Sequence, residues 1–125
     1  MTEIQCELIE ILKIFIETCD EHDIKYSLSF GTLLGAIRHK GIIPWDDDID
    51  VMIKRSDCKR LKSAFEEKHI DNIFLQNYQS DKNYPFPFLT IRKLVSFCLA
   101  SHPISLTLLS FSTMDLKILL FPWLN

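Results

Sequence analysis

Four of the five residues in the stretch 46–50 (DDDID) are aspartates, and this stretch runs directly into the apolar sequence VMI. Successive side chains of a strand point to opposite faces, so a strand here would present Asp48 and Asp50 together on one face and its apolar residues on the other. The two residues would project about 6.5 to 7 Å apart, which is twice the rise per residue. The pattern therefore predicts paired carboxylates beside a core-forming strand.

Two adjacent carboxylates need a compensating charge. At a separation of about 5 Å and an effective dielectric constant near 20, they repel by roughly 3 kcal/mol. A divalent cation offsets this repulsion, and ligands that are all oxygen atoms suit Mg²⁺ or Mn²⁺. Because Mg²⁺ completes its shell with phosphate oxygens and water, we expect Asp48 and Asp50 to be metal ligands and catalytic residues in phosphoryl chemistry.

The acidic stretch has two other interpretations. Runs of Asp are common in solvated turns before strands, and the stretch taken alone fits that role equally well. An EF-hand loop would place Asp46, Asp48, Asp50 and Asp57 at loop positions 1, 3, 5 and 12. That loop needs glycine at its sixth position, where this sequence has the β-branched Val51, so a calcium loop of this type is disfavoured.

Gly31 and Thr32 follow an expected strand over residues 24–29 and open a short helical pattern. A turn from strand to helix exposes backbone N–H groups and a hydroxyl to an anion, and glycine lets a phosphate approach closely. A Gly-Thr pair alone is a weak signal. However, this pair lies one helix upstream of D-I-D, which would place a phosphate-binding turn beside a metal-binding strand. Nucleotidyl transfer requires this arrangement. We predict that Gly31 and Thr32 bind substrate phosphate.

Three basic residues, Arg38, His39 and Lys40, lie between these two features. Arg38 is a candidate for bidentate binding of phosphate, although a basic group at a helix C-terminus also stabilises the helix dipole, and both interpretations weigh evenly. His39 is a conceivable general base without a visible partner. Trp45 has two interpretations, stacking on a base or packing in the core, and we expect the core because buried Trp is commoner.

The elements that would position this site show clear periodicities. Apolar residues recur at three- and four-residue steps over residues 3–21, which predicts an amphipathic helix covering a sheet. Alternating residues over 24–29 and β-branched residues over 49–53 predict strands. Between these strands, Thr32 is the expected N-cap of a helix of about two turns.

Further elements are expected downstream. Ser56 is the predicted N-cap of a second amphipathic helix, whose inward-facing residues are Leu61, Ala64 and Phe65. The sequences IFLQ and FLTIRKLV predict two more strands, which are separated by prolines that enforce an extended connection. The predicted order is α, β, α, β, α, β, β, which indicates an α/β (α+β) domain.

Composition and charge exclude several classes of protein. Hydrophobic residues at 47% and charged residues at 25% are ordinary for a globular chain. A net charge of -3 gives no bulk attraction to nucleic acid, so no nucleic-acid partner is expected. Four scattered cysteines without a C-x-x-C pair indicate neither a zinc site nor a redox motif. The acidic N-terminus shows no signal peptide, and we expect a cytoplasmic location.

Residues 94–125 differ in character from residues 1–93. No formally charged residue lies between Lys93 and Asp115, a length that could in principle cross a bilayer. Seven Ser or Thr residues, a histidine and a proline in that stretch disfavour a spanning helix, so any membrane association is expected to be peripheral. We predict a core over residues 1–93 and a divergent hydrophobic tail over residues 94–125, without an obvious closing element.

The stretch SFGTLLGAIRHKGIIPWDDDIDVMI, residues 29–53, closely resembles the signature of the LicD family, which includes bacterial phosphorylcholine transferases and relatives of fukutin within the nucleotidyltransferase superfamily. The pattern G-T-x-L-G-x-x-R-x-x-x-x-I-P-W-D-D-D-x-D is too long to arise by chance. The resemblance is dense over residues 8–55 and fades afterwards, although YPF and the IRK of residues 91–93 still look like the family's next strand.

The resemblance implies an incomplete nucleotidyltransferase-like fold, with a mixed sheet flanked by helices, and a metal-dependent phosphotransferase. Such an enzyme transfers phosphocholine or a similar phospho-substituent from a CDP-linked donor, such as CDP-choline, to a hydroxyl of a glycan or lipopolysaccharide, with Mg²⁺ or Mn²⁺. Carried over to this sequence, Gly31 and Thr32 would hold donor phosphates, Asp48 and Asp50 would bind metal, and Arg38 would contact phosphate. The neighbouring acids Asp46 and Asp47 match the motif without a clear role.

The chain departs from the family beyond residue 93. Family members are usually longer and continue with an acidic, proline-containing strand that resembles I-D-I-F-P-L-D, to which the flanks of Asp115 match poorly. A truncated or frameshifted member explains this change better than a native tail. The alternative function is therefore a catalytically inactive remnant that at most binds metal or nucleotide.

Overall fold

The computed structural model describes residues 2–71, 73–76, 82–83, 89–97 and 112–123. Within these ranges the chain forms helices packed on a five-stranded sheet. The elements, in chain order, are α1 (Glu3–Glu21), β1 (Tyr26–Leu28), α2 (Phe30–Arg38), β2 (Ile49–Lys54), the 3₁₀ turn η1 (Arg55–Asp57), α3 (Cys58–Lys68), β3 (Ile73–Gln76), β4 (Leu89–Phe97) and β5 (Ser112–Trp123). The predicted α+β domain with a mixed sheet and flanking helices is confirmed.

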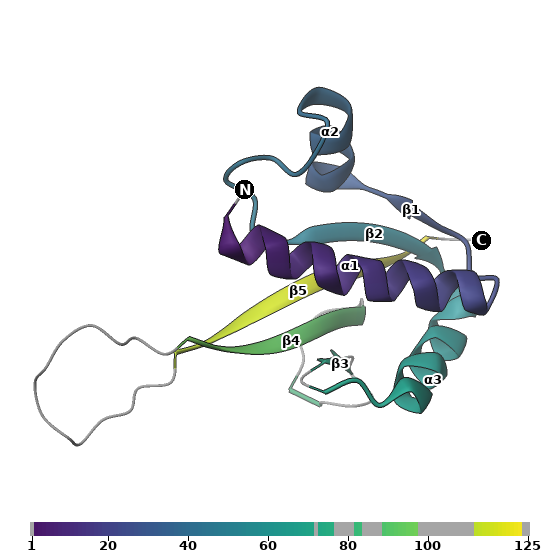
Figure 1. Ribbon diagram of the computed structural model, residues 1–125. Coiled ribbons are helices and arrows are strands. Elements are labelled where there is room, and N and C mark those ends of the chain that lie inside the picture. The colour runs from purple at the N-terminus through teal and green to yellow at the C-terminus, as the bar shows by residue number, and fades with distance from the viewer. Residues whose placement is uncertain (1, 72, 77–81, 84–88, 98–111, 124–125) are drawn as a thin grey trace, which may run out of the picture.

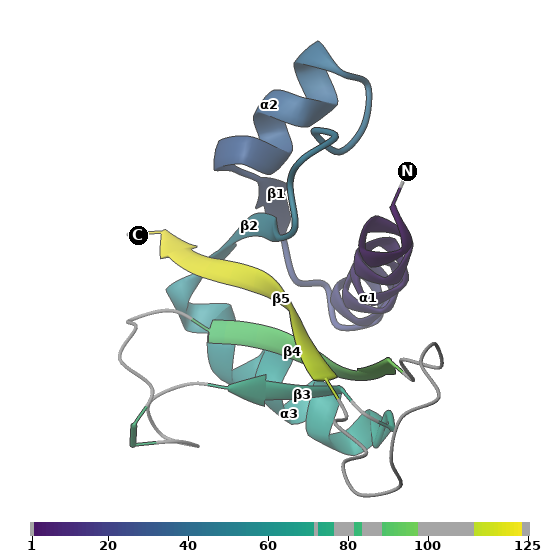
Figure 2. The same cartoon turned by 90° about the vertical axis from the view of Figure 1, so that its left-hand side faces the viewer.

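The strands lie in the order β1-β2-β5-β4-β3 (Figure 2). β2 and β5 run parallel, with Ile49 opposite Ile118, whereas the other neighbouring pairs are antiparallel. The sheet is therefore mixed, as the sequence predicted. β2, which carries Asp50, has a neighbour on each side, so its backbone is held from both edges.

The core joins α1 and α3 to the sheet. Leu8, Ile11 and Phe15 of α1 are fully buried, as are Ile49, Val51 and Ile53 of β2 and Leu61 of α3. The ring of Phe15 meets Tyr26 of β1 edge to face, with centroids 5.4 Å apart. α2 stands apart from this core, above β1 (Figure 1), and Gly35 is its buried residue.

Two predicted helix starts were wrong by a residue or more. α2 begins at Phe30 with Ser29 as its N-cap, instead of after Thr32, because the chain turns directly out of β1. The hydroxyl of Thr32 bonds the backbone of the next strand instead of capping the helix. α3 has Asp57 instead of Ser56 as its N-cap, because a 3₁₀ turn first leads the chain out of β2. The predicted inward residues of α3, Leu61, Ala64 and Phe65, are confirmed.

Strand β5 was not predicted from the sequence. It pairs with β2 along six residues and with β4 along nine, so it lies inside the sheet (Figure 2). An apolar run such as ILLF in β5 fits a strand or a helix equally well, and its partners are distant in the sequence. The proposed division of the chain at residue 93 stays a prediction, but part of the segment after it completes the sheet.

Removing β5 should separate the sheet into two strand pairs, β1 with β2 and β3 with β4, because β2 and β4 meet through it. We expect a chain that ends at residue 111 to lose cooperative thermal unfolding in circular dichroism. The matched control is a chain that ends at Trp123, which keeps β5. An unchanged cooperative transition in the shorter chain would show that β5 is dispensable to the fold.

Cys19 should be an unreactive thiol in the folded chain. It is fully buried, and burial, helped by the nearby Asp20 and Asp57 carboxylates, raises its thiol pKa from 9.0 to about 12. We expect iodoacetamide near pH 8 to modify the exposed Cys6 much faster than Cys19, as measured by peptide mass spectrometry. Between pH 9 and 12 the unfolded thiol ionises while the folded one stays protonated, so the free energy of unfolding should fall as the pH rises. Equal labelling of the two thiols would contradict the packing of α1.

Candidate metal and phosphate site

The turn from β1 into α2 is unusually tight. Ser29 is extended, with φ of -143°, and the next residue, Phe30, adopts a left-handed conformation with φ of 46°. This conformation costs a non-glycine residue about 1 to 3 kcal/mol, and such strain concentrates at functional sites. It starts the helix without a connecting loop, so Gly31 and Thr32 lie in the first turn of α2.

Two hydrogen bonds to the backbone of Asp50 join this helix start to β2. The amide of Ser29 donates to the Asp50 carbonyl at 3.1 Å, and the Asp50 amide donates to the Thr32 hydroxyl oxygen at 2.8 Å. A Cβ atom added to Gly31 would lie 3.1 Å from a carboxylate oxygen of Asp46. The structure therefore brings Gly31 and Thr32 against the acidic stretch, while their binding of phosphate stays a prediction.

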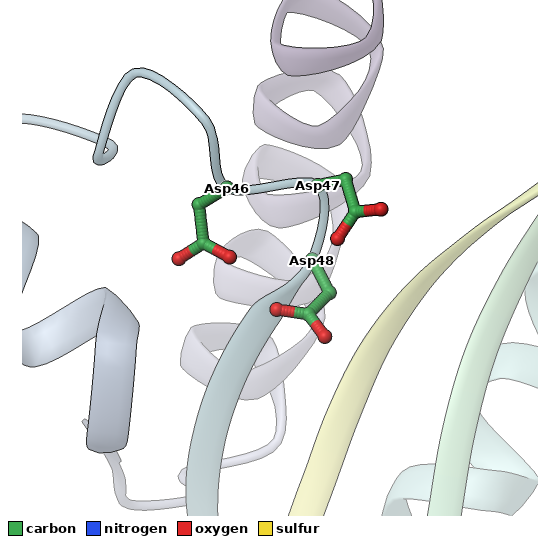
Figure 3. Close-up of side chains that lie close together, drawn as sticks. All are labelled: Asp46, Asp47 and Asp48. Atoms are coloured by element: carbon green, nitrogen blue, oxygen red, sulfur yellow. The ribbon is translucent and has the colours of Figure 1, made fainter.

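Three consecutive carboxylates gather just before β2 (Figure 3). Asp46, Asp47 and Asp48 each offer an oxygen atom, and these atoms lie within 4.8 Å of one another. Asp47 is exposed, and the other two are partly buried. All-oxygen donors at this spacing fit a hard divalent cation such as Mg²⁺ or Mn²⁺.

The acidic group differs from the predicted pair. β2 begins at Ile49, so Asp48 precedes the strand instead of sharing it with Asp50. Asp50 lies within β2, whose residues alternate between buried and partly buried positions, and it is partly buried. Among the described residues, the group of three carboxylates contains Asp48 but not Asp50. Strand alternation does not govern residues before the strand, which lets successive side chains converge.

Sequence reasoning left the roles of Asp46 and Asp47 open. Their signal was present in the motif D-D-D, but their convergence depends on the backbone path before Ile49. The roles of Asp48 and Asp50 as metal ligands and catalytic residues stay predictions.

The basic residues lie at the far end of α2. Arg38 is the last residue of the helix and is exposed, seven residues and about 10 Å along the axis from Gly31. This position suits the helix dipole. Phosphate binding by Arg38 stays a prediction, and a phosphate held at Gly31 would need to extend along the helix to reach it.

The expectation that Trp45 packs in the core was wrong. Trp45 is 79% exposed, and its ring lies roughly perpendicular to that of His39, with ring centroids 6.1 Å apart. Ile43 is buried in its place, because the turn that begins there points Ile43 toward Gly35 and Trp45 outward. Trp45 is thus an exposed ring one residue before the carboxylate group.

Close packing at Gly35 sets the path of the loop between α2 and the acids. A Cβ atom at Gly35 would lie 2.6 Å from the carbonyl oxygen of Gly41 and 3.1 Å from the amide of Ile43. The carbonyl of Gly35 also accepts hydrogen bonds from the amides of His39 and Gly41, at 2.8 and 3.3 Å. The loop therefore folds back onto the helix at the residue that lacks a side chain.

Gly35→Ala should push this loop away from α2, because the atoms that a methyl group would meet belong to the backbone. We expect a loss of about 1 to 3 kcal/mol in the free energy of unfolding, measured by urea denaturation. Gly41→Ala is the matched control, since its Cβ atom would have nothing within 4 Å. Equal stability of the two variants would contradict the close approach at Gly35.

No helix in the described part of the chain combines the length and apolar character that a bilayer span requires. Much of the uncharged stretch that raised this question, residues 98–111, lies outside the described residues.

Comparison with known families covers the segment that carries this site. Residues 23–96 match the family described as LicD/FKTN/FKRP, nucleotidyltransferase domain. This match covers more than half of the 125 residues. The chain belongs to this family. The matched LicD segment contains the turn at Gly31 and the whole acidic stretch, so the resemblance carried by the sequence motif is confirmed.

Two relatives that match this chain have names that state an activity. The lipopolysaccharide cholinephosphotransferase LicD of Haemophilus influenzae is 49% identical over 70 residues, which are 55% of this chain and 26% of that protein. The ribitol 5-phosphate transferase FKRP of Homo sapiens is 38% identical over 60 residues, which are 46% of this chain and 12% of that protein. The relatives are therefore phosphotransferases, and the present chain spans 26% or less of their length.

Proposed function

We propose that this chain carries the donor-phosphate and metal site of a LicD-type phosphotransferase. The reaction would move phosphocholine or a similar phospho-substituent from a CDP-linked donor to a hydroxyl of a glycan or lipopolysaccharide. The observation that carries the proposal is the helix start at Gly31 and Thr32, which is hydrogen-bonded to Asp50 and lies against Asp46, one of three converging carboxylates. The named activities of the two relatives support the same class of reaction.

The carboxylates of the site would bind the metal ion, and the first turn of α2 would bind the donor phosphate. The three converging carboxylates of Asp46, Asp47 and Asp48, together with Asp50 as predicted from the sequence, would hold Mg²⁺ or Mn²⁺, which neutralises charge on the diphosphate when bound. The first turn of α2 would hold a phosphate through backbone N–H groups, aided by the positive end of the helix dipole. The Thr32 hydroxyl accepts from the Asp50 amide and retains its own hydrogen for donation to a phosphate oxygen.

The second candidate is an inactive remnant that binds metal or nucleotide at most. The chain spans 26% of the cholinephosphotransferase relative, so turnover by this chain is a proposal to be tested. A complete transferase must also hold an acceptor, whereas the proposed site concerns the donor phosphate and the metal. The two candidates differ in turnover, whereas both allow binding.

Calorimetric titration with Mn²⁺ and CDP-choline tests the proposal. We expect the unaltered chain to bind both and the double variant Asp48→Asn with Asp50→Asn to lose Mn²⁺ binding by at least tenfold, because the anionic oxygens are removed. Asp23→Asn with Asp71→Asn is the matched control, since it removes the same charge from exposed positions outside the acidic stretch. Circular dichroism should show the same helix content in both variants.

The outcomes separate the candidates. Absence of Mn²⁺ and nucleotide binding by the unaltered chain would contradict the proposed site altogether. Binding without release of cytidine monophosphate, in the presence of a glycan acceptor, would favour the inactive remnant. Equal loss of Mn²⁺ binding in the control variant would show that net charge alone, and not this site, attracts the cation.

A further inference from the structure

Gln5 is the buried polar residue that links α1 to the turn before the acidic stretch. Its side chain is 3% exposed, and its amide nitrogen Nε2 donates to three carbonyl oxygens: those of Ile43 at 3.0 Å, Pro44 at 3.1 Å and Asp46 at 3.1 Å. An amide nitrogen has two hydrogens, so one of these hydrogens is shared between two acceptors. A single side chain thus satisfies three carbonyls of one loop.

These three carbonyls belong to one β-turn. The amide of Asp46 donates to the carbonyl of Ile43 at 2.9 Å, which closes a four-residue turn over residues 43–46. Pro44 occupies the second position, which suits its restricted φ angle. The turn leads directly into Asp47 and Asp48, so its orientation sets where the carboxylate group begins.

The other end of the Gln5 amide is also used. Its Oε1 atom accepts a hydrogen bond from the backbone amide of Thr2 at 3.2 Å. In return, the backbone amide of Gln5 donates to the Thr2 hydroxyl oxygen at 3.2 Å. This reciprocal pair is a capping box that starts α1. Capping accounts for Oε1 alone, and the three bonds of Nε2 to the distant turn require a further explanation.

We propose that Gln5 is a positioning residue for the acidic site. It acts through the turn over residues 43–46 and touches no carboxylate in the contacts described above. α1 is anchored in the core by Leu8, Ile11 and Phe15. The hydrogen bonds of Gln5 therefore hold the turn in a fixed position relative to this helix. Gln5 lies outside residues 23–96, the segment that matches the LicD family. The role rests on the proposed function, because it concerns the geometry of the cation site.

The chemistry of the amide explains why this position holds glutamine. A neutral donor satisfies the carbonyls without adding charge beside the acids. Glutamate is of equal size but is an acceptor when ionised, so it would face three other acceptors. Methionine is of similar length but has no donor, so the carbonyls of Pro44 and Asp46 would lose this partner and the carbonyl of Ile43 would keep the Asp46 amide. Both replacements should release the turn, and glutamate would keep the capping box.

The test compares Gln5→Met with Thr18→Val in two measurements. Thr18 is a fully buried polar residue of the same helix, whose hydroxyl donates to the Ile14 carbonyl at 2.7 Å. Removal of this bond perturbs α1 without touching the turn. The measurements are the dissociation constant of Mn²⁺ by calorimetry and the amide hydrogen exchange rate of Asp46 without metal, both well below the unfolding temperature. We expect Gln5→Met to weaken Mn²⁺ binding at least tenfold and to accelerate Asp46 exchange at least tenfold, and Thr18→Val to change each by less than twofold.

Gln5→Glu keeps the test decisive if Gln5→Met fails to fold. An added carboxylate attracts cations, so simple electrostatics predicts tighter Mn²⁺ binding, whereas loss of the turn predicts weaker binding. Weaker binding with faster Asp46 exchange would support the positioning role. Tighter binding with unchanged exchange would overturn it.

The remaining outcomes are also decisive. Equal weakening of Mn²⁺ binding by Gln5→Met and Thr18→Val would overturn the proposal, because both would then act through the stability of α1. If the unaltered chain does not bind Mn²⁺, the proposed function fails by itself, and the Asp46 exchange rate decides the role of Gln5. Faster exchange in Gln5→Met alone would then establish control of the turn, and unchanged exchange would refute it.

Discussion

The arrangement of the candidate site depends on the two hydrogen bonds to the backbone of Asp50. They bind the end of β1 and the first turn of α2 to the start of β2. Without them, a helix that stands outside the main core would have little to hold its N-terminus beside the acids. The strained Phe30 makes these bonds possible, because it starts α2 immediately after the strand. The strained conformation of Phe30 and the two long-range hydrogen bonds therefore act together to place the start of α2 beside β2.

The acidic stretch is held from two further directions. Gly35 lets the loop after α2 return against the helix, and Gln5 of α1 bonds the turn that follows. The three carboxylates next in the chain converge although they repel one another. The close packing at Gly35 and the hydrogen bonds of Gln5 involve no charged group. They therefore order the backbone without neutralising the carboxylates. A divalent cation bound there would offset the repulsion among the carboxylates, as the proposed transfer reaction requires.

The sheet has two parts that meet at β5, and the site lies on the part formed by β1 and β2. β1 and β2 lie on one side of β5, and β4 and β3 lie on the other. The family match ends at residue 96, before β5 begins, so the strand that joins the two parts lies outside the matched segment. β5, which lies beyond the segment that matches the family, is thus the central strand of the sheet.

Much of this protein follows from local sequence. The apolar stripe over residues 3–21, the alternation through Ile53 and the inward face of α3 correctly predicted the core elements, because burial imposes the same periodicity wherever a helix or strand covers a core. The motif around Gly31 and the acids correctly indicated the LicD family. The same motif did not distinguish which carboxylates converge, since that depends on the path of the backbone before β2.

Only the tertiary structure decided the remaining features. The reach of Gln5 to a turn some forty residues away and the insertion of β5 between β2 and β4 both join segments distant in the sequence. Trp45 was misplaced because its exposure depends on which way the turn faces, not on its own preference for burial. Periodicity reports the faces of single elements, whereas contacts between elements are selected by the packing of the whole chain. For that reason the sequence determined what the site is made of, and the fold determined where its parts meet.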